Sequence, residues 1–306
     1  MRPFIKPTGS LIRKFDFMTK NRFRPIDFIS FAYIFINLLF ILFGWKRILN
    51  PQLHFFVFLM IGIVIFLLVQ YSHKSKTLSF FRDWYPFLAF LYFFEVTSAL
   101  NKVFFPDFID PFFQKIDLLI FGYQPAIQWG LKCDNFFIHE IMAFSYFSYY
   151  LMFPCLGIYL YLKNRKVFHK FVFTLSFVFY TCYLTYNVLP VTGGRFWDLT
   201  LELTKIYRYG IFSRIMTFIY SHTTHYGGAF PSSHVALSVA VTICALRNQK
   251  VLGYIYLVLT FLLSISTVYL HYHYFIDTIF GIFYGIGFYF VALKILTKLE
   301  EKCSVF

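Results

Sequence analysis

One short stretch of the sequence combines flexible, hydroxyl-bearing and titratable residues at the start of an apolar segment. It reads HYGGAFPSSHVALSVA and spans residues 225–240. Pro231 is tolerated in the first turn of a helix, where its missing N–H would be unpaired, and the following backbone N–H groups favour an anion. The hydroxyls of Ser232 and Ser233 and the imidazole of His234 therefore form a candidate phosphate cradle with an attached acid. Taken alone, the motif favours the simpler interpretation of a capped helix start.

A second stretch, STVYLHYHYFIDTIFG (residues 266–281), places a carboxylate four residues after a histidine. That spacing predicts that His273 and Asp277 share one face of a helix. The carboxylate can then orient the imidazole and leave its other nitrogen free as a base or nucleophile. A structural His–Asp pair that joins two helices explains the same spacing equally well.

A third stretch, NVLPVTGGRFW (residues 187–197), ends in an arginine that follows two glycines. A guanidinium binds a phosphate through two parallel hydrogen bonds, so Arg195 is a candidate substrate-binding residue. A lone arginine near a membrane surface also contacts lipid head groups, and this remains the alternative. The same loop contains three further cations without a distinguishing pattern, which are Lys205, Arg208 and Arg214.

The composition shows what kind of scaffold must position these residues. Of 306 residues, 59% are hydrophobic and only 14% are charged, and the chain has 46 Phe and 24 Tyr. Apolar runs near 20 residues predict bilayer spans. The predicted fold is all-α, a polytopic membrane bundle with about eight transmembrane helices. They are expected at residues 27–45, 53–71, 84–105, 136–162, 168–189, 231–247, 250–270 and 275–297.

The basic residues predict the orientation of this bundle. The formal net charge is +14, but 19 of the 28 Lys and Arg fall on one side of the predicted spans and 9 on the other. This bias places both termini in the cytoplasm and argues against nucleic acid as a partner. The three polar stretches then share the extracytoplasmic face of a plasma or inner membrane, or of the ER or Golgi in a eukaryote. The first 26 residues lack a cleavage site for a signal peptide.

Two long outer loops and the glycines of the last span complete the pattern. Residues 106–135 are expected to contain an interfacial helix and residues 190–230 an amphipathic segment. Gly281 and Gly285 have the small-xxx-small spacing of closely packed helices. The five cysteines suggest neither a disulfide nor a zinc site.

Together the motifs resemble the type 2 phosphatidic acid phosphatase superfamily, which also includes the vanadium haloperoxidases. PSSH at 231–234 is similar to its Pro-Ser-Gly-His motif, and Ser266-Thr267, His273 and Asp277 match the spacing of its third motif. The resemblance implies a catalytic core at 84–297. The remaining segments are a basic tail (1–26), an added helix pair (27–83) and a C-terminal tail (298–306).

The resemblance also implies a mechanism that needs no metal or other cofactor. By analogy, His273 is the nucleophile that forms a phosphohistidine, Asp277 orients it and His234 protonates the leaving alcohol. Ser232 and Ser233 correspond to the phosphate-binding turn, and Arg195 is the nearest match to the arginine of the first motif. The expected substrate is a lipid phosphate, and the expected surroundings are membrane lipids.

Three positions depart from the family pattern. Val188 stands where the first motif has lysine, Phe196 replaces its proline, and Thr267 replaces the arginine of the third motif. This pattern is more similar to the branch related to inositol phosphorylceramide synthases, which moves a phosphorylated head group between lipids. The missing positive charge suits a phosphodiester, so head-group transfer is the alternative to hydrolysis of a lipid phosphate. Lys205, Arg208 or Arg214 are candidate substitutes for the missing cations.

Two other classes of membrane protein are alternatives to this enzyme. A membrane di-iron hydroxylase is disfavoured because HTTH (222–225) and HYH (271–273) lack the spacing of histidine boxes. A non-enzymatic transporter is suggested by Glu95 and Glu140, because ionisable residues inside spans are functional candidates. Transport does not require the His–Asp spacing and ranks below the enzyme.

Overall fold

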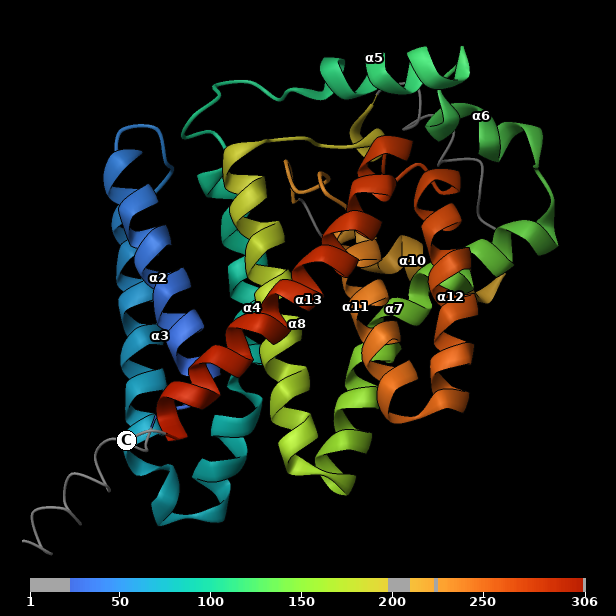
Figure 1. Ribbon diagram of the computed structural model, residues 1–306. Helices are drawn as coiled ribbons and strands as arrows, with labels where there is room; N and C mark the ends of the chain where they lie inside the picture. The colour runs from blue at the N-terminus through green and yellow to red at the C-terminus, as the bar shows by residue number, and fades with distance from the viewer. Residues whose placement is uncertain (1–22, 198–209, 223–224, 305–306) are drawn as a thin grey trace, which may run out of the picture.

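The computed structural model describes residues 23–197, 210–222 and 225–304, and these are almost entirely helical (Figure 1). The segments outside these ranges include most of the N-terminal tail and two of the loop cations, Lys205 and Arg208. The helices are α2 (Pro25–Phe43), α3 (Pro51–Tyr71), η1 (Ser72–Lys74), α4 (Lys76–Leu100), α5 (Asp110–Phe121), α6 (Pro125–Lys132), α7 (Phe136–Lys163), α8 (Arg165–Val188), η2 (Gly194–Phe196), α10 (Ile211–Ser221), α11 (Ser233–Asn248), α12 (Lys250–Tyr269) and α13 (Phe275–Ser304).

The predicted all-α membrane bundle is confirmed, with a helix at each of the eight expected positions. Within the described residues, six of these helices are long and apolar enough to cross a bilayer, namely α2, α3, α7, α8, α12 and α13. The other two are α4, which carries four charged residues, and α11, which has only 16 residues. Most of α11 is buried against other helices, so it does not need a lipid-facing apolar surface.

Helix α11 lies at the centre of the bundle and packs against α7, α8, α12 and α13. A Cβ on Gly281 would lie 2.7 Å from the carbonyl oxygen of Ser232, and one on Gly285 would lie 2.4 Å from that of Ala236. The small-xxx-small spacing predicted in the last span is thus used for the close approach of α13 to the first turns of α11. The added pair, α2 and α3, packs on α4 at one side of the bundle (Figure 1).

Short helices cover one end of the bundle. Helix α5 lies crosswise over that end, next to the start of α13, and α6 follows it (Figure 1). Both fall in the 106–135 loop, where one interfacial helix was expected. Helix α10, in the second long loop, is amphipathic as predicted: Phe212, Met216 and Ile219 belong to one apolar cluster, whereas Arg214 and Thr217 on the opposite face are exposed.

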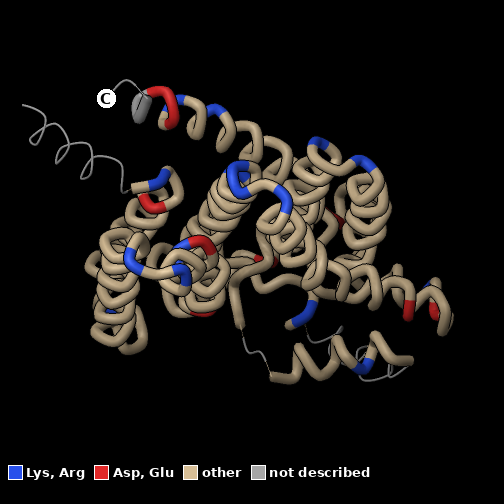
Figure 2. Tube along the Cα trace, turned by 90° about the horizontal axis from the view of Figure 1, so that it is seen from below, with Lys and Arg blue, Asp and Glu red and all other residues tan. Residues whose placement is uncertain are grey.

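The opposite end of the bundle carries most of the described basic residues, on the turns between helices (Figure 2). Two buried carboxylates organise part of this end. Asp83 lies 2.5 Å from Arg24 and 2.7 Å from Arg165, measured between oxygen and nitrogen. Asp27 lies 2.9 Å from Arg82, with both side chains buried. These ion pairs tie α2 to α4, and α4 to the start of α8.

Candidate active site

Three loop segments far apart in the sequence meet at the end of the bundle covered by α5. Val191 and Gly228 form an isolated parallel β-bridge, and the N–H of Ala229 donates to the carbonyl of Val191 at 2.8 Å. Gly193 has φ +81°, and a Cβ there would lie 2.6 Å from the carbonyl oxygen of Tyr272. The backbones of the three polar stretches are therefore in direct contact, which a side chain at position 193 would prevent.

Two aspartates of α5, which the sequence analysis did not identify, hold these loops in place. The carboxylate of Asp110 accepts hydrogen bonds from the N–H groups of Thr192 and Gly193 and from the hydroxyl of Tyr274. Asp117 accepts from the N–H groups at the start of α13, at 2.7 and 3.1 Å. Burial raises the pKa of Asp117. Their spacing of seven residues puts both on one helical face, a signal available in the sequence.

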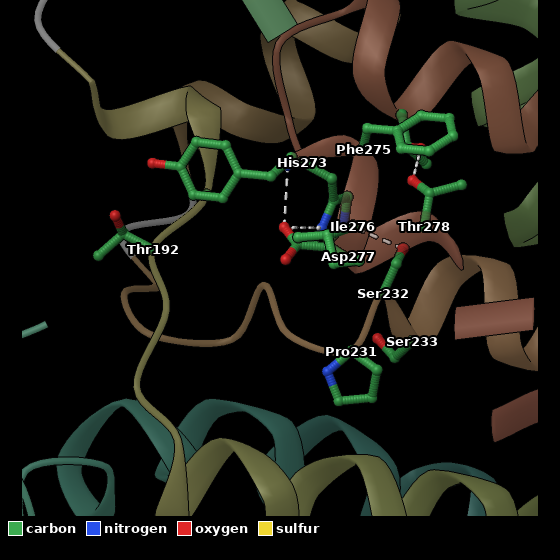
Figure 3. A network of polar contacts seen from close by, with 12 residues as sticks. Thr192, Pro231, Ser232, Ser233, His273, Phe275, Ile276, Asp277 and Thr278 are labelled. Atoms are coloured by element: carbon green, nitrogen blue, oxygen red, sulfur yellow. Dashed lines mark hydrogen bonds and ion pairs between the residues drawn. The ribbon is translucent and has the colours of Figure 1, made fainter. Parts of the chain in front are cut away.

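His273 lies in the turn before α13, between Ser232 and Asp277 (Figure 3). Its Nε2 is 3.2 Å from Oγ of Ser232, and its Nδ1 is 3.5 Å from Oδ2 of Asp277. The expectation of a shared helical face was wrong, because α13 begins only at Phe275. Asp277 instead folds back over the start of its helix, where Oδ2 also accepts from the N–H of Tyr274 at 2.9 Å.

His234 is the second residue of α11 and faces His273. The centroids of the two imidazoles are 6.2 Å apart and their planes are inclined at 63°. The rings of Tyr146 and Tyr149 from α7 pack against His234, with centroids at 4.9 and 4.4 Å. Two histidines that are 39 positions apart in the sequence thus face each other, one beside a carboxylate and one among tyrosines.

The start of α11 differs in two details from the predicted phosphate cradle. Pro231 precedes the helix instead of occupying its first turn, and Ser232 is the N-cap residue. The hydroxyl of Ser232 does not cap the helix, because it is directed toward His273. One N–H expected to be available for an anion, that of Ser233, donates to the hydroxyl of Tyr186 at 3.2 Å.

A cavity of about 360 Å³ opens onto these groups. Its lining includes His273, His234, Ser233 and Arg195, whereas Ser232 and Asp277 lie behind it. The guanidinium of Arg195 donates to the carbonyl of Tyr220 and lies 4.2 Å from the centre of that ring. The cavity thus brings together residues from all three polar stretches.

The missing family cations are not replaced by any described lysine or arginine. Among the described residues, Arg195 is the lysine or arginine that lines the cavity. Arg214 is exposed on α10 and is not part of the lining, while Lys205 and Arg208 lie outside the described residues. Thr267, which occupies the position of the family arginine, is hydrogen-bonded to Ser264 and Thr278.

The rest of the cavity wall is largely aromatic and apolar and extends along three helices. It includes Phe87, Phe90 and Leu91 of α4, Phe153 of α7 and Phe179 of α8. Such a lining favours a hydrocarbon chain over a polar group. The polar groups are gathered at one end of this apolar space.

Burial sets the protonation state of the histidine beside the carboxylate. It lowers the pKa of His273 to about 4, opposed by a hydrogen bond with the backbone of Ala229. At neutral pH the imidazole is therefore uncharged. A neutral ring retains a lone pair on one nitrogen, which is the form required of a nucleophile or base.

His225 and Glu140, which suggested a di-iron hydroxylase and a transporter, make contacts that hold segments of the chain together. His225 stacks on Phe94 with centroids 4.0 Å apart and lies 2.8 Å from the hydroxyl of Thr97. Glu140 accepts hydrogen bonds from the N–H groups of Phe212 and Ser213 at the start of α10. Within the described ranges, no three His, Cys, Asp or Glu side chains are grouped as ligands for a metal.

In this helical membrane bundle, an apolar cavity ends at two histidines, and a carboxylate lies beside one of them. The family model of the PAP2 superfamily matches residues 117–291, and the chain belongs to this superfamily. A PA-phosphatase related-family protein of Dictyostelium discoideum is 39% identical over 69 residues, which are 20% of this chain and 12% of that relative. The chain therefore spans a small part of the relative's length. No solved structure matches the chain.

Proposed function

We propose that this protein is an integral membrane lipid phosphatase or phosphotransferase that works through a phosphohistidine intermediate. The observation that carries the proposal is the meeting of His273 and His234 at one cavity, 6.2 Å apart between ring centroids, with Asp277 directly behind His273. Membership of the PAP2 superfamily supports a phosphatase-type reaction. We assign the catalytic core to residues 84–297 and regard the helices of residues 27–83 as an addition to it.

In the first step of the proposed reaction, Nε2 of His273 attacks the phosphorus of a lipid phosphate ester. The bond between phosphorus and the leaving oxygen breaks, and His234 gives its proton to that oxygen. Asp277 stabilises the positive charge that develops on the attacking imidazole. Arg195 stabilises the negative charge on the phosphoryl oxygens.

In the second step, a hydroxyl attacks the phosphohistidine and restores the enzyme. His234 now acts as the base that removes the proton from the attacking oxygen, and the bond between His273 and phosphorus breaks. If the hydroxyl belongs to water, the protein is a phosphatase. If it belongs to a second lipid, the protein is a phosphotransferase.

A lipid substrate is supported by the apolar part of the cavity. Phe87, Phe90 and Phe179 line a space that continues from the two histidines along α4 and α8. A hydrocarbon chain placed there would be removed from water and would hold its phosphate at the polar end. Because α4 and α7 flank this space, a lipid would enter it from within the bilayer.

Transfer of a phosphorylated head group is a second candidate, and one observation favours it. Of the described residues, Arg195 is the single lysine or arginine in the cavity lining. A phosphomonoester carries more negative charge than a phosphodiester and would need more compensation than one guanidinium offers. A phosphodiester donor of the kind used by inositol phosphorylceramide synthases places less demand on the site.

We place the site on the extracytoplasmic face and both termini in the cytoplasm. The end opposite the cavity carries the basic turns, which include Lys163, Lys166 and Lys250. Lys and Arg accumulate in cytoplasmic loops. Labelling of single cysteines introduced at Gln124 and at Lys250, with an impermeant maleimide on intact cells or vesicles, tests this orientation.

The proposed function is tested by removing each imidazole in the purified protein. His273→Ala and His234→Ala are expected to abolish release of phosphate or head group from a panel of lipid phosphates while preserving expression and monodispersity. His222→Ala is the matched control, because His222 is exposed and lies outside the cavity lining. Normal turnover by His273→Ala would overturn the mechanism.

A further inference from the structure

Glu95 is a carboxylate at the cavity that the proposed mechanism does not use. It belongs to α4, five residues before that helix ends at Leu100, which corresponds to about 7.5 Å along the axis. Its side chain is exposed and contributes to the same cavity lining as Arg195 and His273. It makes no hydrogen bond or ion pair with any described residue.

The surroundings of Glu95 make an unpaired carboxylate costly. On the same face of α4, Leu88 is 60% exposed, and Leu91, which lines the cavity, is 72% exposed, so Glu95 lies on an open and apolar surface. An ionisable residue at such a position marks a substrate pathway unless a partner within the protein neutralises it. No described side chain does so, which leaves this position open to a group that the substrate brings.

The described lining of the cavity contains one arginine and one carboxylate. Arg195 supplies the positive charge and Glu95 the negative charge. Burial lowers the pKa of both His273 and His225 to about 4, so neither adds charge at neutral pH. His234 also lines the cavity, and in the proposed first step its proton leaves with the alcohol. An anionic head group would be attracted to Arg195 but repelled by Glu95. A head group that carries one charge of each sign satisfies both.

We propose that the donor lipid is a zwitterionic phosphodiester, whose phosphate is held at Arg195 and His273 while its ammonium group is held at Glu95. This inference rests on the proposed function and adds the class of head group to it. Aromatic rings form much of the remaining wall, among them Phe94, Tyr150 and Tyr183. Their faces attract an ammonium or quaternary ammonium group, whereas they offer little to the hydroxyls of a sugar-like head group.

The test compares four diacylglycerol lipids that differ only in the group on the phosphate. Phosphatidylcholine, phosphatidylethanolamine, phosphatidylinositol and phosphatidic acid all release diacylglycerol in the first step, so one product is measured for all four. The full-length protein is used in detergent. We expect kcat/KM for the choline or ethanolamine lipid to exceed that for phosphatidylinositol and phosphatidic acid by about tenfold or more.

The role of Glu95 is tested with variants of graded charge. Glu95→Gln is expected to lower kcat/KM about tenfold or more for the zwitterionic lipids and to leave the two anionic lipids unchanged or improved. Glu95→Asp keeps the charge and should retain the preference, whereas Glu95→Lys should shift it toward the anionic lipids. Glu300→Gln is the control, since Glu300 pairs with Lys170 at the opposite end of the molecule.

The outcomes separate this inference from the proposed function. A wild-type preference for phosphatidic acid or phosphatidylinositol, or an equal loss on all four lipids in Glu95→Gln, overturns the head-group assignment. If His273→Ala is inactive on the same four lipids when either of these results is obtained, the head-group assignment fails but the phosphohistidine proposal stands. If His273→Ala remains active, the proposed function itself fails.

Discussion

Two buried carboxylates, one at each end of the bundle, have contrasting surroundings. At the end with the basic turns, Asp27 receives hydrogen bonds from Arg82, from the hydroxyl of Tyr85 and from the N–H of Arg24. At the other end, Asp277 is equally buried, but its Oδ1 has no hydrogen-bond partner and its Oδ2 lies 3.5 Å from His273. One carboxylate is fully compensated, and the other is held next to an imidazole that, in the proposed mechanism, becomes charged only during the reaction.

This difference shows how each end is stabilised. Ion pairs join α2, α4 and the start of α8 at the basic end, where Asp83 contacts Arg24 and Arg165. At the site, the loops are held by backbone contacts and by Asp110 and Asp117 of α5, which bind N–H groups. Because much of the scaffold is supplied by other residues, the side chains of His273 and Asp277 are available for the proposed chemistry. Buried polar atoms without a partner are uncommon and mark such places.

The largest expected effect is a loss of activity when Asp277, but not Asp27, loses its charge. Asp277→Asn keeps the shape of the side chain but removes the charge that orients and stabilises the His273 imidazole, so kcat should fall by about 10²–10⁴-fold. Unfolding in detergent should change little. Steady-state kinetics beside a thermal melt checks both, and a variant with more than half of the wild-type kcat would contradict the role of Asp277.

The corresponding change at the basic end should have the reverse effect. Asp27→Asn leaves the buried guanidinium of Arg82 without its counter-charge, which costs about 3–5 kcal/mol of stability. The remaining folded protein should turn over substrate at the wild-type rate, since Asp27 lies far from the cavity. A melting temperature equal to that of the wild type would show that the ion pair contributes nothing to the fold.

A smaller effect tests whether backbone packing positions the site. Gly193→Ala introduces a Cβ 2.6 Å from the carbonyl oxygen of Tyr272 at a φ of +81°, which costs about 1–3 kcal/mol and displaces Arg195. Gly287→Ala is the control, because nothing lies within 4 Å of a Cβ there. We expect reduced kcat/KM only in Gly193→Ala, and equal kinetics in the two variants would exclude the positioning role.

The smallest expected effect is that of pH on the stability of the fold, and burial of the histidines sets its direction. The pKa of His225 is lowered from 6.5 to about 4 in the folded protein, and that of His273 is also lowered to about 4. The folded state therefore binds fewer protons than the unfolded state below pH 6.5. Stability is complete above that pH and falls toward pH 4 by about 1.4 kcal/mol per pH unit and per histidine. His225→Gln should flatten the dependence of the melting temperature on pH, and equal slopes in the variant and the wild type would contradict the contribution of His225.

Much of the fold could be predicted from the sequence because apolar length is a strong signal. All eight helices lie where apolar runs predicted them, and Gly281 and Gly285 make the predicted close approach to α11. The central position of α11 was not predictable, because a short apolar run in the middle of a bundle looks the same as one that faces lipid.

The candidate site was predictable as a set of residues and less so as a geometry. Spacing alone indicated His273 and Asp277, yet it suggested one helical face, whereas the helix begins only after His273. The support from Asp110 and the cavity position of Glu95 depend on how distant segments pack, and a single sequence does not carry that information. The tyrosines around His234 were hidden for the same reason, since aromatic residues are abundant throughout this chain.

The central claim is that His273 forms a covalent bond to phosphorus, and trapping that bond tests it most directly. The purified protein is mixed with a lipid labelled in its phosphate, quenched in alkali within milliseconds to seconds, digested and mapped by mass spectrometry. The account predicts an acid-labile label on the peptide that contains His273, absent from His273→Ala. A label on another residue, or turnover in His273→Ala without any labelled intermediate, would contradict it.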